Sequence, residues 1–234
     1  MDGERLRTLA IDVGGTGLKA SVIDNKGELL TERARVDTPV GAAPQEIVAV
    51  LGRLVAPLGA YDRVSVGFPG VVRDGRVLTA ANLGNDGWRR FDLAGALAAA
   101  LGKPVRVAND ADVQGLAVIA GKGVEMVITL GTGFGTGLYL DGKLAPHLEL
   151  AHHPFRQRET YDQQRGNAAR KTVGLERWNK RVKKALTNIR ILTTFDHLYI
   201  GGGNAKRIAF ALDPDITIIS NEAGLSGGVA LWRA

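Results

Sequence analysis

A Gly-rich turn between two apolar strands occurs twice in this chain and constrains its fold more than any other feature. The first copy runs over residues 9–24 and the second over residues 126–141. A single offset superimposes Gly14 on Gly131 and also aligns the acidic-Gly stretch that ends each copy. Each copy therefore predicts a strand, a Gly/Thr turn, a second strand and an acidic-Gly turn that closes a second hairpin.

Turns of this composition suit the binding of phosphate. Glycine lets the backbone adopt conformations that other residues avoid, and it lets a ligand approach closely. Successive N–H groups then point into one concavity, which suits phosphate oxygens. The alternative is a tight hairpin in which glycine serves turn geometry alone. The candidate phosphate-binding residues are Gly14, Gly15, Thr16 and Lys19 in the first copy, and Gly131, Thr132 and Gly133 in the second.

Length and composition indicate an ordinary soluble globular protein. The chain has 234 residues, of which 45% are hydrophobic and 23% charged, and it has no cysteine. Disulfides and thiolate metal sites are therefore excluded. The charged start runs directly into a strand, unlike a secretory signal, and no apolar run approaches the ~20 residues that cross a bilayer. We expect a cytoplasmic protein that has no membrane partner.

The net charge of +6 is concentrated in one segment. Residues 156–190 carry eleven Lys or Arg against three acids, a local balance of +8, and the rest of the chain is therefore at −2. A basic segment of this kind predicts a polyanionic partner, and the alternative is a solvated helix face. The candidate residues of a polyanion track are Lys180, Arg181, Lys183 and Lys184.

Strands and helices alternate along the chain with short connections, which predicts the α/β class. Because the hairpin unit occurs twice, we expect two similar lobes that face each other across a cleft. The expected strands outside the hairpins cover residues 64–68, 105–108, 197–200 and 215–220. The expected helices cover residues 44–58, 93–101, 111–120, 174–186 and 223–232.

Asn109 and Asp110 follow the predicted strand at 105–108, where α/β sheets usually place their ligands. An aspartate at this point suits the removal of a proton from an attacking hydroxyl, and the neighbouring asparagine suits holding that hydroxyl in line. The alternative is that Asp110 simply caps the helix that follows, since Asp and Asn are preferred caps.

Two further stretches carry polar or flexible residues after apolar ones. Glu149, His152 and His153 suggest a metal site only weakly, because a third well-spaced ligand is missing. A carboxylate and an imidazole equally suit the hydroxyls of a polyol, and surface histidines before a proline are the simpler alternative. Gly201 and Gly202 begin a glycine triplet that we expect to accept phosphates or ribose at the start of a helix.

At this point the motifs resemble a family. Five stretches occur in the order seen in the ROK family of sugar kinases and repressors, and other stretches, which include Ala80–Asn82, residues 178–182 and residues 220–224, resemble its polyphosphate glucokinase branch. The five stretches are Asp12–Thr16, Asn109–Asp112, Gly131–Gly137, Glu149–His152 and Gly201–Gly203.

The resemblance implies an actin-like, ribonuclease H-like fold with two lobes around a central cleft. It implies residues 1–111 as the N-terminal lobe, rejoined by the helix at 222–234, and residues 112–221 as the C-terminal lobe. It also implies a homodimer. Because the first hairpin stands so near the start of the chain, we expect no DNA-binding helix-turn-helix and no nucleic-acid partner.

The resemblance also assigns roles to residues. Asp12 would act on Mg²⁺ and the donor phosphate, usually through water, and the two turns would hold the transferred phosphoryl group. Asp110 would be the general base, while Asn109, Glu149 and His152 would bind the sugar. The Cys-rich zinc motif of most ROK kinases is absent, so no structural zinc is expected. The usual glycine before His152 is replaced by Leu150-Ala151, and Glu159 is a guess for the sugar-binding glutamate of that motif.

The function expected from these residues is phosphoryl transfer to the 6-hydroxyl of glucose, with mannose as another acceptor. The donor would be polyphosphate, ATP or both, with Mg²⁺. Two alternatives stay open: an ATP-dependent kinase of another hexose or N-acylated amino sugar, and a catalytically silent sugar-binding regulatory protein.

Overall fold

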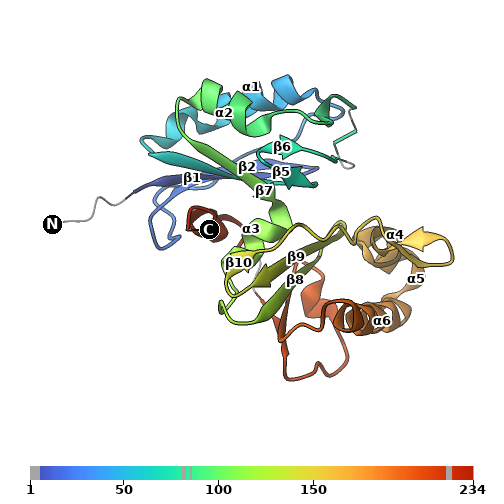
Figure 1. The fold of residues 1–234 in the computed structure, drawn as a ribbon. Coiled ribbons are helices and arrows are strands. Elements are labelled where there is room, and N and C mark those ends of the chain that lie inside the picture. Colours follow the sequence, from blue (N-terminus) through green and yellow to red (C-terminus); the bar gives the residue numbers. More distant parts are fainter. Residues whose placement is uncertain (1–5, 81–82, 85, 220–222, 234) are drawn as a thin grey trace. The chain divides into compact units, whose positions relative to one another are not determined.

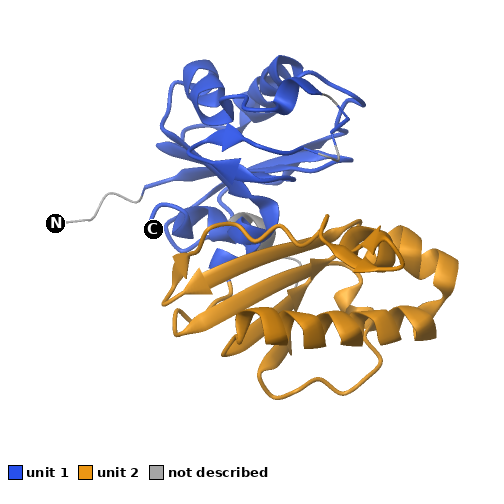
Figure 2. Ribbon diagram, turned by 45° about the vertical axis from the view of Figure 1, so that its right-hand side comes forward, with its two compact units in different colours: residues 1–117, 222–234 blue, residues 118–221 orange. Residues whose placement is uncertain are grey.

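The structure is a computed structural model that describes residues 6–80, 83–84, 86–219 and 223–233. It divides into two compact units, which are coloured separately in Figure 2: unit 1 is Met1–Ala117 with Glu222–Ala234, and unit 2 is Val118–Asn221. The lobe boundary expected after residue 111 falls inside helix α3 (Asp110–Leu116). The two units divide after Ala117, which follows the end of this helix.

Unit 1 contains a five-stranded mixed sheet within the described residues (Figure 1). β1 pairs antiparallel with β2 and parallel with β4, and β4 pairs parallel with β7. From one edge to the other the strands are β3 (Ala34–Val36), β2 (Leu18–Ile23), β1 (Thr8–Val13), β4 (Arg63–Phe68) and β7 (Val105–Asn109).

Unit 2 contains a second five-stranded sheet within the described residues, and this sheet repeats the first. β8 pairs antiparallel with β9 and parallel with β13, and β13 pairs parallel with β14. The expectation of two similar α/β lobes is therefore confirmed. The strands in order are β10 (Lys143–Leu144), β9 (Phe134–Leu140), β8 (Val124–Leu130), β13 (His197–Gly201) and β14 (Ile216–Ile218).

The two hairpins differ by one residue in their turns. Val13 pairs with Leu18, so four residues form the first turn. Leu130 pairs with Phe134, so three residues form the second turn. The uniform offset seen in the sequence therefore does not extend to the cross-strand partners beyond the turn.

The sheet of unit 1 has helices on both faces, and the alternation of side chains along β1 explains why. Leu9 and Ile11 point to the face covered by α1 (Pro44–Val55) and α2 (Leu93–Leu101). Ala10 points to the other face, where it meets Val229 of α7 (Ala223–Ala230). Successive residues of a strand face opposite sides, so both faces of β1 are buried.

Local signals fix the ends of the helices in unit 1. Pro44 occupies the first turn of α1, where a missing N–H costs nothing. The Asp92 carboxylate accepts a hydrogen bond from the Gly95 N–H and caps α2, and Gly102 ends α2 in the left-handed region at φ 65°. α3 ends at Leu116, earlier than expected.

In unit 2, the long helix α6 (Leu175–Thr193) packs its apolar face on the sheet. Trp178, Val182 and Ile189 recur at helical spacing and are fully buried against strand residues such as Ile128. The helix is longer than the one expected over residues 174–186. The short helices α4 (Tyr161–Arg165) and α5 (Asn167–Val173) precede it.

The remaining elements are short. Strand β5 (Val72–Arg73) pairs antiparallel with β6 (Arg76–Val77) around Asp74-Gly75. The elements are η1 (Ala56–Leu58), β5 (Val72–Arg73), β6 (Arg76–Val77), η2 (Asp86–Trp88), β11 (Pro154–Arg156), β12 (Glu159–Thr160), η3 (Ala205–Arg207) and α7 (Ala223–Ala230).

Two glycines of α7 let this helix lie unusually close to its neighbours in unit 1. A Cβ atom at Gly227 would stand 1.8 Å from the carbonyl oxygen of Val113 in α3. A Cβ atom at Gly228 would stand 3.1 Å from Cβ of Ser65 in β4. The Ser65 hydroxyl donates to the Gly228 carbonyl at 2.6 Å, which fixes the helix on the sheet.

Gly227→Ala should therefore lower the stability of the protein. Overpacking of this kind costs about 1–3 kcal/mol, measured as a change in the free energy of unfolding in urea. Gly52→Ala is the matched control, because Gly52 lies within α1 and no atom stands within 4 Å of its added Cβ. The control should raise stability by about 0.5–1 kcal/mol, since alanine is the better helix former. Equal effects of the two changes would contradict the close packing of α7.

Candidate active site

An ion pair stands at the base of the first Gly-rich turn. Asp12 on β1 and Lys19 on β2 are cross-strand partners, and Lys19 Nζ lies 3.0 Å from Asp12 Oδ2. The side chains are 26% and 47% exposed, so both remain within reach of a ligand. The matching pair in the second hairpin is Thr129 and Gly135, where the Thr129 hydroxyl accepts from the Gly135 N–H at 3.1 Å. The charged pair therefore belongs to the first turn.

The residues at this position fit a magnesium ion that arrives with its donor. Mg²⁺ usually keeps several waters and binds through one or two carboxylates together with substrate phosphates. Asp12 supplies one accessible carboxylate of this kind. The described part of the chain holds no group of three or more His, Cys, Asp or Glu side chains that suits a metal held by protein alone.

The first turn presents free N–H groups at its tip. The Gly14 N–H donates to Gly17 O at 3.0 Å, and the Thr38 hydroxyl donates to Gly14 O at 2.6 Å. Gly15 and Thr16 are exposed, and their N–H groups have no acceptor within residues 6–80 or the other described ranges. Two adjacent N–H groups without acceptors suit the oxygens of a phosphate.

The second turn has the same property. The Gly131 N–H donates to Gly133 O at 3.1 Å, which closes the turn. The N–H groups of Thr132 and Gly133 have no acceptor among the described residues. The Gly131 carbonyl accepts from the Asn167 N–H at 3.1 Å and from the Asn204 side chain at 3.2 Å. Two asparagines therefore fix the turn through its Gly131 carbonyl, while the N–H groups of Thr132 and Gly133 stay available.

The predicted glycine triplet packs against this second turn. A Cβ atom at Gly202, which has φ 88°, would lie 2.5 Å from Leu130 O, so only glycine fits. The structure thus brings Gly201 and Gly202 beside the turn that begins at Gly131. The expected helix after the triplet is wrong, because only the 3₁₀ turn η3 follows. A single short turn offers no extended helix dipole for a phosphate.

Asn109 and Asp110 stand where β7 passes into α3. Asn109 caps the helix: its Oδ1 accepts from the Ala111 N–H at 2.8 Å. Its Nδ2 donates to Gly70 O at 3.1 Å, and the side chain is buried. Asp110 is the first residue of the helix, and its Oδ1 accepts from the Ala111 N–H at 2.9 Å. The cap is therefore Asn109, which leaves the Asp110 carboxylate at the end of the strand.

In unit 2, Glu149 has a partner that the sequence motif does not include. Its Oε2 lies 3.6 Å from Nε2 of His147, and its Oε1 accepts from the Ala151 N–H at 3.0 Å. Burial alone would raise the pKa of the Glu149 carboxyl. The hydrogen bond and charge of His147, followed by the charge of His152, outweigh burial and lower this pKa below its ordinary value. Sequence reasoning missed His147, and the available signal was its position two residues before Glu149.

Asp162 is a second residue that sequence reasoning missed. Its Oδ1 accepts from the Phe134 N–H, directly after the second turn. Burial raises the pKa of Asp162, the Phe134 hydrogen bond and the charge of His152 act against the rise, and the charge of Glu149 adds to it. Glu159, the guess for an additional sugar-binding acid, is instead exposed on β12. The Thr160-x-x-Gln163 pattern is a capping box and predicts the helix that carries Asp162.

The four candidate residues of the polyanion track all lie on α6 but differ in their surroundings. Lys180 pairs with Glu176 at 2.8 Å. Arg181 Nη1 lies 3.4 Å from Gln164 O. Lys184 is exposed and has no ion pair within the described residues. The four positive charges are therefore not equally available to a polyanion.

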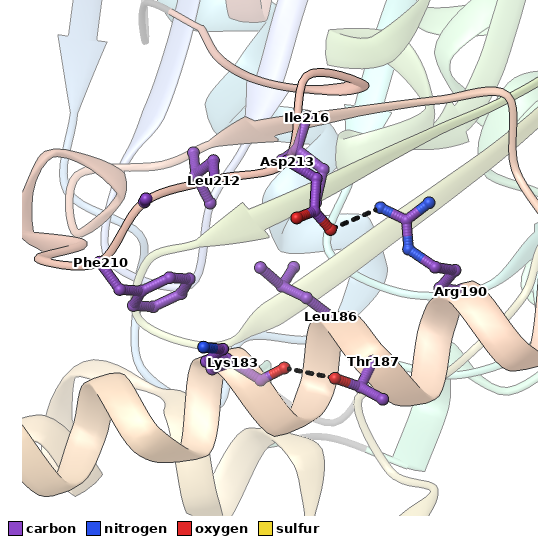
Figure 3. Close-up of a pocket in the computed structure, with 9 residues that line it drawn as sticks. Lys183, Leu186, Thr187, Arg190, Phe210, Leu212, Asp213 and Ile216 are labelled. Carbon is purple, nitrogen blue, oxygen red and sulfur yellow. Dashed lines mark hydrogen bonds and ion pairs between the residues drawn. The ribbon is translucent and has the colours of Figure 1, made fainter.

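Lys183 lines a cavity of about 260 Å³ on the same helix (Figure 3). In Figure 3 the aromatic ring of Phe210 lies beside Lys183, and its centroid is 6.0 Å from Nζ. At the other end, Arg190 pairs with Asp213 at 3.0 Å and with Asp215 at 2.6 Å. Lys183, which is exposed like Lys180 and Lys184, therefore lies at a cavity that both apolar and charged side chains line.

Among the helices of the described residues, none combines the length and the apolarity that crossing a bilayer requires.

Comparison with known proteins identifies the family. The model of the ROK family matches residues 8–148, which is more than half of the chain and includes the first turn, Asn109-Asp110 and the second turn. The chain belongs to the ROK family. The Ala81–Asn82 and Ser220–Glu222 stretches that resemble one branch of the family lie outside the described residues.

Two curated relatives are named for different activities. The chain is 33% identical over 208 residues to the polyphosphate glucokinase of Mycobacterium tuberculosis strain CDC 1551, covering 85% of this chain and 78% of that one. It is 35% identical over 144 residues to the N-acetylmannosamine kinase of Escherichia coli strain SE11, covering 59% and 49%.

A solved structure supports the fold over the whole chain. The crystal structure of the inorganic polyphosphate/ATP-glucomannokinase from Arthrobacter sp. strain KM matches with a TM-score of 0.87 at 33% identity. The match covers 98% of this chain and 100% of that chain. The expected ROK-type, actin-like fold of two α/β lobes is therefore confirmed.

The contacts of Glu149 predict how the stability of the protein depends on pH. The folded-state pKa of Glu149 is lowered from 4.5, so its ionised form stabilises the fold above that pH, and this contribution is lost as the pH falls through the folded pKa. Glu149→Gln should therefore lower the melting temperature at pH 7 by about 2–4 °C, and the difference should narrow below about pH 4.5. Glu159→Gln, at an exposed position, is the control. A difference that grows on acidification would contradict this electrostatic account.

Proposed function

We propose that the protein is a sugar kinase that transfers a phosphoryl group from polyphosphate, ATP or both to the 6-hydroxyl of glucose, with mannose as another acceptor. The observation that carries the proposal is the pair of turns, each with two adjacent N–H groups that have no acceptor among the described residues. The named activities of the M. tuberculosis and Arthrobacter relatives support the same reading.

On the donor side, the residues of the first turn would bind the charged phosphates of the donor. Asp12 would hold Mg²⁺ that enters with the donor, and the metal would neutralise charge on the transferred group. Lys19, now 3.0 Å from Asp12, would pair with donor oxygens when Asp12 binds the metal. The N–H groups of Gly15 and Thr16, with those of Thr132 and Gly133, would hold phosphate oxygens. Phosphoryl transfer depends mainly on such alignment and charge neutralisation.

On the acceptor side, Asp110 would act as the general base. The sugar oxygen forms a bond to the phosphorus while the bridging P–O bond of the donor breaks, and the hydroxyl proton passes to the Asp110 carboxylate. Asn109, expected as a sugar ligand, is engaged on both sides of its amide. We therefore propose that it contributes first by fixing the strand end that carries Asp110. Asp110 need not be strongly basic, since the bond from the sugar oxygen to phosphorus is only weakly formed in the loose transition state of phosphoryl transfer.

Glu149 and His152 would bind the remaining hydroxyls of the sugar. A carboxylate kept ionised by His147 is a strong hydrogen-bond acceptor, and His152 is exposed next to it. Several fixed hydrogen-bonding groups on one polyol also select among sugars, because a missing partner leaves a polar group unpaired.

The central test is formation of glucose 6-phosphate with either donor. Wild-type protein should form product with Mg²⁺ and polyphosphate or ATP, and Asp110→Asn should lower kcat by about 10²- to 10⁴-fold. Asp37→Asn, at an exposed position, is the control and should leave kcat unchanged. Binding of glucose to Asp110→Asn, measured by calorimetry, separates loss of chemistry from loss of the sugar.

The other outcomes of this test are informative. Product with ATP alone keeps the kinase and removes polyphosphate as donor. No product with glucose but turnover of an N-acylated amino sugar favours the activity named for the E. coli relative. Sugar binding without transfer from any donor to any hexose would overturn the enzyme and favour a silent sugar-binding protein.

The exposed lysines of α6 generate a prediction about the donor. We propose that Lys180, Arg181, Lys183 and Lys184 form a track for polyphosphate, in which the three lysines are exposed and Arg181 is half-buried. Lys180→Glu with Lys184→Glu should raise the KM for polyphosphate about tenfold or more at low salt and spare the KM for ATP, because exposed charges act over a Debye length of about 10 Å.

The matched control is Lys103→Glu with Lys122→Glu, which changes the net charge equally at exposed positions outside α6. Equal losses with both donors, or an equal effect of the control, would reduce the basic segment to a solvated helix face. Repeating the KM measurement at high salt should abolish the difference between the variants.

A further inference from the structure

Asp162 connects the second Gly-rich turn to a helix in unit 2. It lies in α4 (Tyr161–Arg165), and its Oδ1 accepts the N–H of Phe134, the first residue of β9. The Phe134 side chain is buried in the core of the unit. The bond therefore fixes the exit of the turn at the point where the chain enters the core.

The same carboxylate explains why residue 133 is glycine. A Cβ atom at Gly133 would lie 2.8 Å from Asp162 Oδ1, 2.9 Å from Oδ2 and 3.1 Å from Cγ. Gly133 does not have the positive φ that favours glycine for conformational reasons. The obstacle to a larger residue is thus the Asp162 side chain and not the backbone of the turn.

The backbone around Asp162 holds the stretch that carries Glu149 and His152. The Asp162 N–H donates to Ala151 O at 3.0 Å, and the Tyr161 N–H donates to His153 O at 3.2 Å. One residue therefore contacts the proposed sugar-binding stretch through its main chain and the proposed phosphate turn through its side chain.

The support beneath Asp162 is rigid. Thr160 and Gln163 form a capping box at the start of α4. Arg165 at its end is fully buried, with its guanidinium 3.2 Å from the ring centroid of Phe155, and it donates twice to Arg181 O. A side chain on such a base can transmit a displacement instead of absorbing it.

We propose that Asp162 is a positioning residue that sets the second phosphate turn and couples it to the stretch holding Glu149 and His152. Its catalytic meaning rests on the proposed function, because that function assigns the turn to the donor and the stretch to the sugar. The hydrogen bond to Phe134 leaves the N–H groups of Thr132 and Gly133 as the donors that face a ligand.

The test is a double-mutant cycle on Gly133 and Asp162 that is read first without any substrate. Loss of one hydrogen bond should speed amide hydrogen exchange at Phe134 about fivefold in Asp162→Ala. Asp162→Asn retains an oxygen acceptor and should stay within about twofold of wild type. Gln163→Ala is the control for weakening of α4 alone and should leave Phe134 exchange near the wild-type rate.

Gly133→Ala supplies the decisive comparison. Its methyl group collides with the carboxylate in the wild-type background, whereas the Asp162→Ala background has room for it. Gly133→Ala should therefore speed exchange at Phe134 when Asp162 is present and add less than about twofold when it is absent. Independent, multiplicative effects would overturn the proposal, as would an Asp162→Asn variant that behaves like Asp162→Ala.

Kinetics then test the coupling. In Asp162→Ala the KM for the donor should rise about fivefold, while the dissociation constant for the sugar changes less than twofold. Sugar binding should slow Phe134 exchange in the wild type and not in Asp162→Ala; the same slowing in both would overturn the coupling. Absence of kinase activity would refute the proposed function. The hydrogen-exchange cycle needs no turnover, so it would still test the positioning role of Asp162.

Discussion

The constraint on which the site depends is the register of the two hairpins. Pairing of β1 with β2 places Asp12 opposite Lys19, and pairing of β8 with β9 places Thr129 opposite Gly135. The ladders, together with the Thr129 and Asp162 side chains in unit 2, take up the N–H groups that flank each turn, and the N–H groups at the tip have no acceptors in the described residues. Hydrogen bonding in the sheet therefore decides which backbone groups remain for a ligand.

Each unit supports its turn by a different device. In unit 1, the Thr38 hydroxyl holds Gly14 O, while the sheet beneath is packed on both faces. In unit 2, Asn167 and Asn204 hold Gly131 O from two segments distant in sequence. Preorganised backbone donors are effective because they need no rearrangement when charge develops on the ligand.

Much of this could be predicted from the sequence, because periodicity and turn chemistry are local. Asp92 and Gly102 marked the ends of one helix, and the repeated glycine turn indicated two similar sheets. The role of Asp162 could not be predicted, because Phe134 and Gly133 become its neighbours only through tertiary packing. His147 stands two residues before Glu149, but that spacing alone does not distinguish a pair from two independent side chains. The helix expected after Gly203 is absent, since Asn204 bonds to Leu130 O and Gly131 O and the 3₁₀ turn η3 follows. Roles that depend on such contacts are invisible to a reading of spacing.

Because the two turns differ by one residue, the sequence offset and the strand register give different counterparts for Lys19. Position 136 corresponds by offset to Lys19, yet Thr136 pairs with Ile128 on the core face, where it is buried and its hydroxyl donates to Leu148 O. A lysine at position 136 would place its charge in the interior. The structural counterpart of Lys19 is instead Gly135, which pairs with Thr129. A charged pair in the second hairpin would therefore need changes at residues 129 and 135, and not at the residue that the sequence offset indicates.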